Sequence, residues 1–135
     1  MKRQRCRTKP VIMIAESNSD ERLILRAVVK FLGFDVMEAV HRNQLIALCR
    51  ETTPDLLVLD LALPRLGGTD AIKIVRRELA LPRLPVVAVA SRDAVGQVRL
   101  PRRSVVFLPK PVDLEKLYFL MDRLLPGRIT SLAKS

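Results

Sequence analysis

The amino-acid sequence predicts an α/β fold, a doubly wound three-layer sandwich with a five-stranded parallel sheet between two layers of helices. Three observations lead to this prediction. The chain has 135 residues, 49% of them hydrophobic, which suits one domain with a substantial core. Short apolar runs alternate with amphipathic segments, as strands and helices do around a parallel sheet. The central run at 56–59 is apolar on both faces, which is typical of a strand covered by helices on two sides.

The first half of the chain predicts two strands, each followed by a helix. Ser19 can cap the first helix, because its hydroxyl can accept a hydrogen bond from a backbone N–H of the first turn. Gly33 suits the left-handed position that ends a helix, and Pro54 breaks the second helix. His41 precedes the second helix, where a capping or solvated role is expected. The predicted elements are a strand at 11–15, a helix at 20–32, a strand at 35–39 and a helix at 42–51.

The second half continues the alternation less regularly. In the stretch 91–103, Gly96 and Pro101 limit any helix to about two turns. Arg76 and Arg77 are expected on the solvated face of a helix. The predicted elements are strands at 56–59, 86–90 and 104–108, a helix at 70–79 capped by Thr69, and a helix at 114–125 capped by Asp113. The last helix has one apolar stripe, formed by Leu114, Leu117, Leu120, Met121 and Leu124.

The composition excludes several classes of protein. All apolar runs are far shorter than the roughly 20 residues of a membrane-spanning helix, and the run at 11–15 is too short for a secretory signal. We therefore expect a cytoplasmic protein without a membrane span. The distant positions of Cys6 and Cys49 predict two thiols rather than a disulfide or a metal site. With no Trp, one Tyr and four Phe, a base-stacking nucleic-acid module is not favoured.

The formal net charge of +10 is unevenly distributed. Residues 1–10 form a basic N-terminal arm, residues 126–135 form a C-terminal tail, and the predicted folded domain spans 11–125. Outside the arm, the tail and the stretch 92–103, bases and acids balance at 13 each. That stretch predicts a basic surface for a partner, formed by Arg92, Arg99, Arg102 and Arg103.

Several polar side chains follow the predicted strands, where the ligands of open parallel sheets collect. The residues at these strand ends are Glu16 and Ser17, Asp60, Ala90 and Ser91, and Lys110. Two carboxylates and one ammonium converging there would be a costly concentration of charge in a purely structural site. The set therefore predicts a divalent cation, a phosphoryl group, or both.

Three motifs at these strand ends resemble those of response-regulator receiver domains, which belong to two-component signalling. The motifs are Ile14-Ala15-Glu16-Ser17, the segment 54–64 with Gly68 beyond it, and Leu108-Pro109-Lys110-Pro111. The resemblance covers about 11–125, and it implies a flavodoxin-like fold with the strand order 2-1-3-4-5. It further implies a single-domain signalling protein that is not an enzyme.

The resemblance implies a role for each matching residue. Asp60 would accept a phosphoryl group from a histidine kinase or a phosphotransfer protein. Mg²⁺ would be held by Glu16, Asp60 and the backbone carbonyl of Ala62, since Mg²⁺ prefers hard oxygen ligands. Lys110 would pair with the phosphoryl oxygens and neutralise part of their charge. Phe107 would be the switch aromatic of the fifth strand, although it has no hydroxyl.

Two positions depart from the family pattern. Ser17 stands where a second acidic residue is usual, and shifting the alignment by one residue still leaves a single acid. Ala90 stands where a Ser or Thr hydroxyl is usual. Ser91 replaces that hydroxyl only if the strand has already ended or slipped by one residue, because side chains alternate along a strand. The site is therefore expected to be partly degenerate, with weak or absent Mg²⁺ binding.

Three functions follow from these patterns. The first is signalling through phosphorylated Asp60, with a downstream protein target bound through 92–103 and the face of the fifth strand. The second is a pseudo-receiver that binds proteins without phosphate, in which Glu16 forms only a structural ion pair with Lys110. The third is binding of nucleic acid or another anion through the basic arms, which would weaken steeply with salt.

Overall fold

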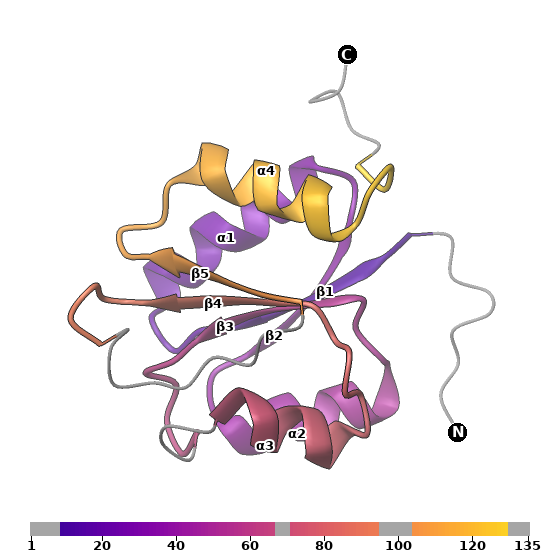
Figure 1. The fold of residues 1–135 in the computed structure, drawn as a ribbon, viewed down its shortest axis with the longest axis vertical. Helices are drawn as coiled ribbons and strands as arrows, with labels where there is room; N and C mark the ends of the chain where they lie inside the picture. The colour runs from indigo at the N-terminus through magenta and orange to yellow at the C-terminus, as the bar shows by residue number, and fades with distance from the viewer. Residues whose placement is uncertain (1–8, 67–70, 95–103, 130–135) are drawn as a thin grey trace.

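The computed structural model describes residues 9–66, 71–94 and 104–129. The elements in these ranges are β1 (Val11–Ala15), α1 (Ser19–Phe31), β2 (Asp35–Ala39), α2 (Arg42–Glu51), β3 (Leu56–Asp60), α3 (Ala71–Leu79), β4 (Val86–Ala90), β5 (Val105–Pro109) and α4 (Leu114–Leu124). The strands form one parallel sheet in the order β2-β1-β3-β4-β5, which confirms the predicted topology. Helices α1 and α4 cover one face of the sheet, and α2 and α3 cover the other (Figure 1).

The register of the strands brings their carboxyl ends to one edge of the sheet. Ala15, the last residue of β1, lies beside Leu59 of β3, so Asp60 extends one residue beyond that pair. At the other side of the sheet, Ala90 and Pro109 lie beside each other at the ends of β4 and β5. The residues that follow β1, β3 and β5 therefore share one edge, as a doubly wound sheet requires.

Two apolar cores fill the space between the sheet and its helices. Leu57 and Leu59 of β3 pack in the core formed with α2 and α3. Leu56 and Val58 pack in the core formed with α1 and α4, because alternate side chains of a strand point to opposite faces. All four are at most 1% exposed, and burying a side chain of this size stabilises the fold by about 1.5–3 kcal/mol. The central strand that carries Asp60 is thus held from both sides.

The caps of α2 and α4 agree with the sequence prediction, whereas the cap of α1 does not. Asn18, not Ser19, caps α1, since its side chain accepts a hydrogen bond from the backbone N–H of Glu21 at 2.9 Å. The prediction of Ser19 was wrong by one residue, because an asparagine carbonyl caps as well as a serine hydroxyl and stands earlier in the chain. His41 caps α2 and Asp113 caps α4, as predicted.

The later elements differ from the prediction by small shifts. β5 starts one residue later than expected, because Ser104 has a left-handed backbone with φ 54° that does not continue a strand. α3 begins at Ala71, and its predicted cap, Thr69, lies outside the described residues, as does 95–103. Leu114, predicted in the apolar stripe of α4, is 39% exposed, so the buried stripe begins one turn later.

Arg76 contradicts the predicted solvated face of α3. Its residue is 5% exposed, and its guanidinium donates to the carbonyl of Leu84 from Nε at 3.1 Å and from Nη2 at 2.5 Å. Nη2 also donates to the carbonyl of Ser104 at 3.5 Å, and burial lowers the pKa of the guanidinium. Arg77 is exposed, as predicted. The buried positions recur at helical spacing and are Ala71, Ile72, Val75, Arg76 and Leu79.

Three smaller features complete the fold. Gly33 takes a left-handed backbone with φ 97° just after α1, a conformation that a residue without Cβ adopts easily. Cys49 of α2 is fully buried in the core between that helix and the sheet, and Cys6 lies outside the described residues. Within the described ranges, no helix has both the length and the apolar character to cross a bilayer.

Candidate functional site

Three charged side chains meet at the carboxyl edge of the sheet. Glu16 follows β1, Asp60 ends β3 and Lys110 follows β5. Lys110 Nζ lies 2.9 Å from Asp60 Oδ2 and 3.4 Å from Glu16 Oε1. The residues Glu16 and Asp60 are only 2% and 4% exposed. The structure thus brings together the two carboxylates and the ammonium that the strand ends predict.

Backbone hydrogen bonds fix the members of this cluster. The N–H of Glu16 continues the bonding between β1 and β2, and the N–H of Lys110 donates to the carbonyl of Ala90 at 2.9 Å. Asp60 Oδ1 accepts a hydrogen bond from the N–H of Ala62 at 2.9 Å. The side chains are therefore held by the sheet and by the turn after β3, which is the preorganisation that a reactive site needs.

A third carboxylate, Glu21, joins the cluster although the sequence reasoning did not place it there. Glu21 Oε1 lies 3.1 Å from Lys110 Nζ, and the Glu21 side chain is 40% exposed. It comes from the first turn of α1, where an acid also suits the helix dipole. The sequence held a usable signal, because a helix that follows β1 must begin at the carboxyl edge. An acid in its first turn is therefore close to the residues after the strands.

The close charges shift the pKa values of two members. Burial, followed by the neighbouring Asp60 carboxylate, raises the pKa of Glu16 to about 7. The N–H of Asn18, which donates to Glu16 Oε2 at 3.1 Å, and the Lys110 ammonium oppose this rise. Burial alone would lower the pKa of Lys110, but the surrounding carboxylates, Asp60 first and then Glu21, raise it above its usual range. Lys110 therefore stays charged, whereas Glu16 is near its titration midpoint at neutral pH.

The donor set at this edge suits Mg²⁺. Glu16 and Asp60 are neighbouring buried carboxylates, and burial followed by the Asp60 carboxylate raises the pKa of Glu16, an effect that a bound cation would oppose. Mg²⁺ commonly keeps several waters and binds through one or two carboxylates, so this pair suffices. Ala62, predicted to offer its carbonyl, lies in the turn that contacts Asp60. Among the described residues, no three His, Cys, Asp or Glu side chains form a metal site.

The positions that depart from the receiver pattern lie at the same edge. Ser17 is exposed in the turn after β1. Ala90 is the last residue of β4 and is 4% exposed, and Ser91 follows it with an exposed side chain. The strand has therefore ended before Ser91, which is the condition for this hydroxyl to replace the missing one. Its contact with a phosphoryl group stays a prediction.

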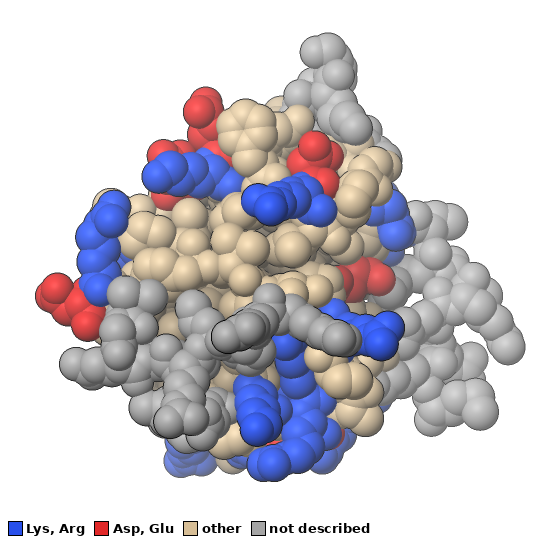
Figure 2. Space-filling model, viewed as in Figure 1, with Lys and Arg blue, Asp and Glu red and all other residues tan. Residues whose placement is uncertain are grey.

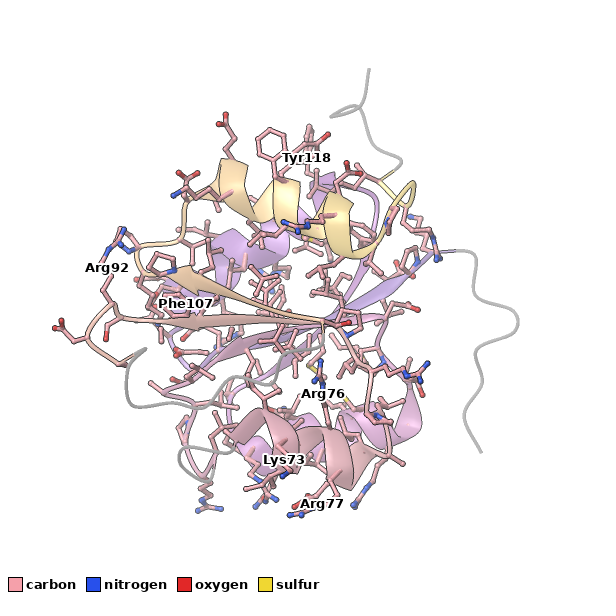
Figure 3. The ribbon with its side chains drawn as sticks, viewed as in Figure 1. Lys73, Arg76, Arg77, Arg92, Phe107 and Tyr118 are labelled. Carbon is pink, nitrogen blue, oxygen red and sulfur yellow. The ribbon has the colours of Figure 1, made fainter. Side chains whose placement is uncertain are left out.

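The predicted output residues are described only in part. Phe107 is half-buried on β5, and Arg92 is exposed in the turn after β4 (Figure 3). Figure 3 shows the Arg92 side chain extending outward at the carboxyl edge of the sheet. The other members of the predicted basic partner surface lie outside the described residues, namely Arg99, Arg102 and Arg103. One residue of that surface, Arg92, is therefore placed at the carboxyl edge of the sheet.

A cavity of about 230 Å³ lies beside the cluster, between α1 and the turn from β5 to α4. Glu16 and Glu21 form its polar part. Its apolar lining consists of Ile24, Leu25, Pro111, Val112 and Leu114. Ile24 is 51% exposed, so the apolar lining is open at the surface. An accessible apolar groove thus adjoins the charged site.

Comparisons with known proteins agree with this geometry. The model of the response regulator receiver domain matches residues 12–122. Protein PilH of Pseudomonas aeruginosa is 27% identical over 118 residues, covering 86% of this chain and 98% of PilH. The solved structure of chemotaxis protein CheY4 of Vibrio cholerae is similar with a TM-score of 0.73 at 17% identity, covering 87% of this chain and 100% of that one.

A second solved structure is the receiver domain of sensor histidine kinase PA1611 of Pseudomonas aeruginosa, which has a magnesium ion coordinated in its active site cleft. It is similar with a TM-score of 0.72 at 21% identity, covering 87% of this chain and 98% of that one. These structures share the fold described above. Because the family model spans the sheet from β1 to α4, this chain belongs to the family of response regulator receiver domains.

Proposed function

We propose that this receiver domain accepts a phosphoryl group on Asp60 from a histidine kinase or a phosphotransfer protein in the cytoplasm. The observation that carries the proposal is the position of Asp60, with Lys110 Nζ at 2.9 Å and the buried Glu16 carboxylate on the same ammonium. This combination supplies a nucleophile, a fixed cation and a second oxygen ligand at one strand end. The protein is then the acceptor in a phosphorelay rather than an enzyme.

The proposed transfer uses the Asp60 carboxylate as the nucleophile. An oxygen of Asp60 attacks the phosphorus of a phosphohistidine on the partner, so a P–O bond forms and the P–N bond breaks. The imidazole nitrogen leaves with the electron pair and can take up a proton from water. The hydrogen bond from the Ala62 N–H to Asp60 Oδ1 holds the carboxylate in one orientation during this step.

Lys110 and Glu16 balance charge in this scheme. The raised pKa keeps the Lys110 ammonium protonated, and its position on Asp60 Oδ2 lets it contact a phosphoryl group on that side chain. Glu16, Asp60 and the Ala62 carbonyl would hold Mg²⁺, which neutralises charge on the transferring group. We expect weaker Mg²⁺ binding than in a site with two acids after β1, because Ser17 offers no carboxylate.

The groove beside the site supports docking of the phosphodonor protein. The donor must bring a histidine nitrogen to Asp60, so it must cover the carboxyl edge. Ile24 and Leu114, which are 51% and 39% exposed, give that partner an apolar surface adjoining Glu21. We further propose that the downstream target binds the predicted surface around Arg92 and the face of β5.

A small phosphodonor tests the proposal. Acetyl phosphate with Mg²⁺ should add one phosphate to the chain, measured as intact mass, and Asp60→Asn should abolish the addition. Asp93→Asn is the matched control, because Asp93 is an exposed carboxylate shortly after β4, and this variant should be phosphorylated like the wild type. An unchanged mass of the wild-type chain with every donor would overturn the proposal.

The same cluster gives some support to a second function, that of a pseudo-receiver. Lys110 contacts all three carboxylates of the cluster, so the edge is held by ion pairs in the absence of a phosphoryl group. Ser17 and Ala90 also replace groups that phosphorylation uses elsewhere in the family. In this alternative, a protein partner binds wild type and Asp60→Asn with equal affinity, with or without a phosphodonor. Calorimetric titration with that partner would separate the two functions.

A further inference from the structure

Helix α3 and its two flanking loops carry four exposed cations. Lys73 and Arg77 stand one turn apart on α3. Arg65 and Arg83 are exposed in the loops before and after the helix. Figure 3 shows Lys73 and Arg77 pointing away from the sheet, and Figure 2 shows Lys and Arg side chains gathered at this end of the molecule. We call Arg65, Lys73, Arg77 and Arg83 the α3 basic face.

The charges of the α3 basic face are not neutralised by the described residues around it. Glu78 is the one acidic residue in the described part of 61–85. Its carboxylate forms an ion pair with Arg42 of α2. None of the four cations forms an ion pair with another described residue. Asp70 lies outside the described residues. Among the described residues, the face therefore carries positive charges with which no carboxylate pairs.

The opposite helical layer is mixed in charge. On α1, Arg22 and Arg26 pair with Glu38 of β2 at 3.2 Å and 3.1 Å. Figure 2 shows acidic and basic side chains interspersed over α4. The exposed large apolar residues of the described chain lie outside α3 and its flanks, and they are Leu23, Ile24, Phe31, Val40, Leu114 and Phe119. The α3 basic face is thus both more cationic and less apolar than the α1–α4 layer.

We infer that the α3 basic face binds the phosphate backbone of a nucleic acid. α3 has 9 residues, so the cations spread over about 13 Å of helix and its two flanks instead of converging on one small anion. Duplex DNA presents one negative charge per about 1.7 Å of its axis, which suits such an extended array. Arg65, Arg77 and Arg83 can each bind phosphate through two parallel hydrogen bonds.

Two other anionic partners fit the α3 basic face less well. Interfaces with acidic proteins usually have an apolar or aromatic centre, which this face lacks. Helices that bind anionic membranes insert apolar side chains, whereas the apolar residues Ile72, Val75 and Leu79 of α3 are buried in the core. Because the face has no aromatic residue to stack on unpaired bases, it suits a duplex better than a single strand. Contacts to phosphate carry no sequence information, so the binding is expected to be independent of sequence.

The inference is tested by the fluorescence anisotropy of a short DNA duplex of mixed sequence, titrated with the full chain at several salt concentrations. Each phosphate neutralised contributes about 0.9 to the slope of log affinity against log salt. Lys73→Gln/Arg77→Gln should therefore lower the slope by about two and weaken binding at least about tenfold at low salt. Lys116→Gln/Arg123→Gln on α4 removes the same charge from exposed positions and should change the affinity by less than about twofold.

The outcomes distinguish this surface from other sources of binding. Absence of DNA binding, or an equal loss in the α3 and α4 variants, would overturn the inference. A loss confined to Arg3→Gln/Arg5→Gln/Arg7→Gln would also overturn it by assigning the binding to the N-terminal arm. If circular dichroism shows that the α3 variant is unfolded, Arg65→Gln/Arg83→Gln provides the same test in the loops.

Polyglutamate and phosphatidylserine vesicles are the competing probes. Tighter binding of either probe than of DNA, with the same loss in Lys73→Gln/Arg77→Gln, would assign the face to an acidic protein or a membrane and overturn the nucleic-acid assignment. Asp60→Asn should bind DNA like the wild type. This last comparison separates a failure of the present inference from a failure of the proposed phosphorylation.

Discussion

Two largely buried cations stand at opposite ends of the sheet, and their partners differ in kind. Lys110 lies at the carboxyl edge against three carboxylates, whereas Arg76 lies near the starts of β4 and β5 and donates to the neutral carbonyl oxygens of Leu84 and Ser104. Glu16 can change protonation, and the three carboxylates can bind another cation in place of the ammonium. The backbone carbonyls of Leu84 and Ser104 do not titrate. The comparison distinguishes a site whose protonation and bound cation can change from a set of hydrogen bonds that only stabilises the fold.

The hydrogen bonds of Arg76 connect three elements, namely α3, β4 and β5. Its carbonyl partner Leu84 precedes β4, and the carbonyl of Ser104 also accepts a hydrogen bond from the N–H of Val86 in β4 at 2.7 Å. Arg76 itself belongs to α3, so one side chain ties that helix to the starts of two strands. Removing Arg76 takes the guanidinium donor away from the carbonyl of buried Leu84, whereas its exposed neighbour Arg77 has no such role.

The largest predicted effect is that of Arg76→Ala. We expect a loss of about 3 kcal/mol in the free energy of unfolding, because hydrogen bonds from a charged donor to buried acceptors disappear. Urea denaturation followed by circular dichroism measures the change. Arg77→Ala, one residue away, should lie within about 0.5 kcal/mol of the wild type. Equal destabilisation by the two variants would mean that the hydrogen bonds of Arg76 add nothing to stability beyond what an exposed arginine contributes.

The second predicted effect is a dependence of stability on pH caused by Glu16. Its pKa is 4.5 when unperturbed and about 7 in the folded chain, so the folded state binds this proton more tightly. The stabilisation is present below pH 4.5 and is lost as the pH rises through about 7. We expect the wild type to lose about 2 kcal/mol between pH 5 and pH 8 through this group.

Denaturation curves across this pH range provide the measurement. Glu16→Gln should flatten the pH dependence, because glutamine does not titrate. Glu51→Gln is the matched control, since Glu51 is exposed and lies far from the cluster, and this variant should keep the wild-type dependence. A stability that rises from pH 5 to pH 8 only in the wild type would contradict the sign worked out here.

The third predicted effect is the loss of stability in Lys110→Ala, at the carboxyl edge of the sheet. Lys110→Ala should destabilise the chain by about 1–2 kcal/mol at pH 8, because two buried carboxylates lose their common partner. The loss should be smaller at pH 5, where Glu16 is protonated. Lys116→Ala, an exposed lysine on α4, should have almost no effect at either pH. A pH-independent loss in Lys110→Ala would show that packing rather than charge is lost.

The smallest predicted effect is that of Mg²⁺. At a concentration a few times its dissociation constant, Mg²⁺ should raise the stability of the folded chain by about 1 kcal/mol at pH 8. The rise should be smaller at pH 5, because protonated Glu16 is a poor ligand, and chelation by EDTA should reverse it. Thermal melts of wild type and Glu16→Gln with and without Mg²⁺ make the comparison. An equal rise in both proteins would place the ion elsewhere.

The sequence predicted the parts of the molecule that depend on local pattern. β1, β3 and β4 stand out as short apolar runs, and because strands in a parallel sheet end together, the meeting of Asp60 with Lys110 followed from their positions. The cap at Asn18 was missed, since adjacent cap-forming residues differ little in propensity. Arg76 was missed because residue type suggested solvent, although its position on the buried stripe of α3 suggested the core.

Contacts that depend on side-chain reach were beyond sequence reasoning. Glu21 lies in the first turn of α1, and its distance of 3.1 Å from Lys110 depends on how α1 packs against the sheet. The positive charge of the α3 basic face was also not visible in the net charge of the sequence. Outside the basic arm, the tail and 92–103, the numbers of bases and acids are equal. The contrast between the mixed charges of the α1–α4 layer and the cations of the α3 basic face arises only once the chain is folded.

The titration of Glu16 has a consequence for how the carboxyl edge handles protons. With its pKa raised to about 7 by burial and the neighbouring Asp60 carboxylate, this side chain is partly protonated at neutral pH. A cation that needs the ionised carboxylate must expel the bound proton, and an arriving anion draws protons in. Binding would then change the pH of a weakly buffered solution, and its calorimetric heat would depend on the ionisation enthalpy of the buffer. Cation binding at this edge is therefore linked to proton release.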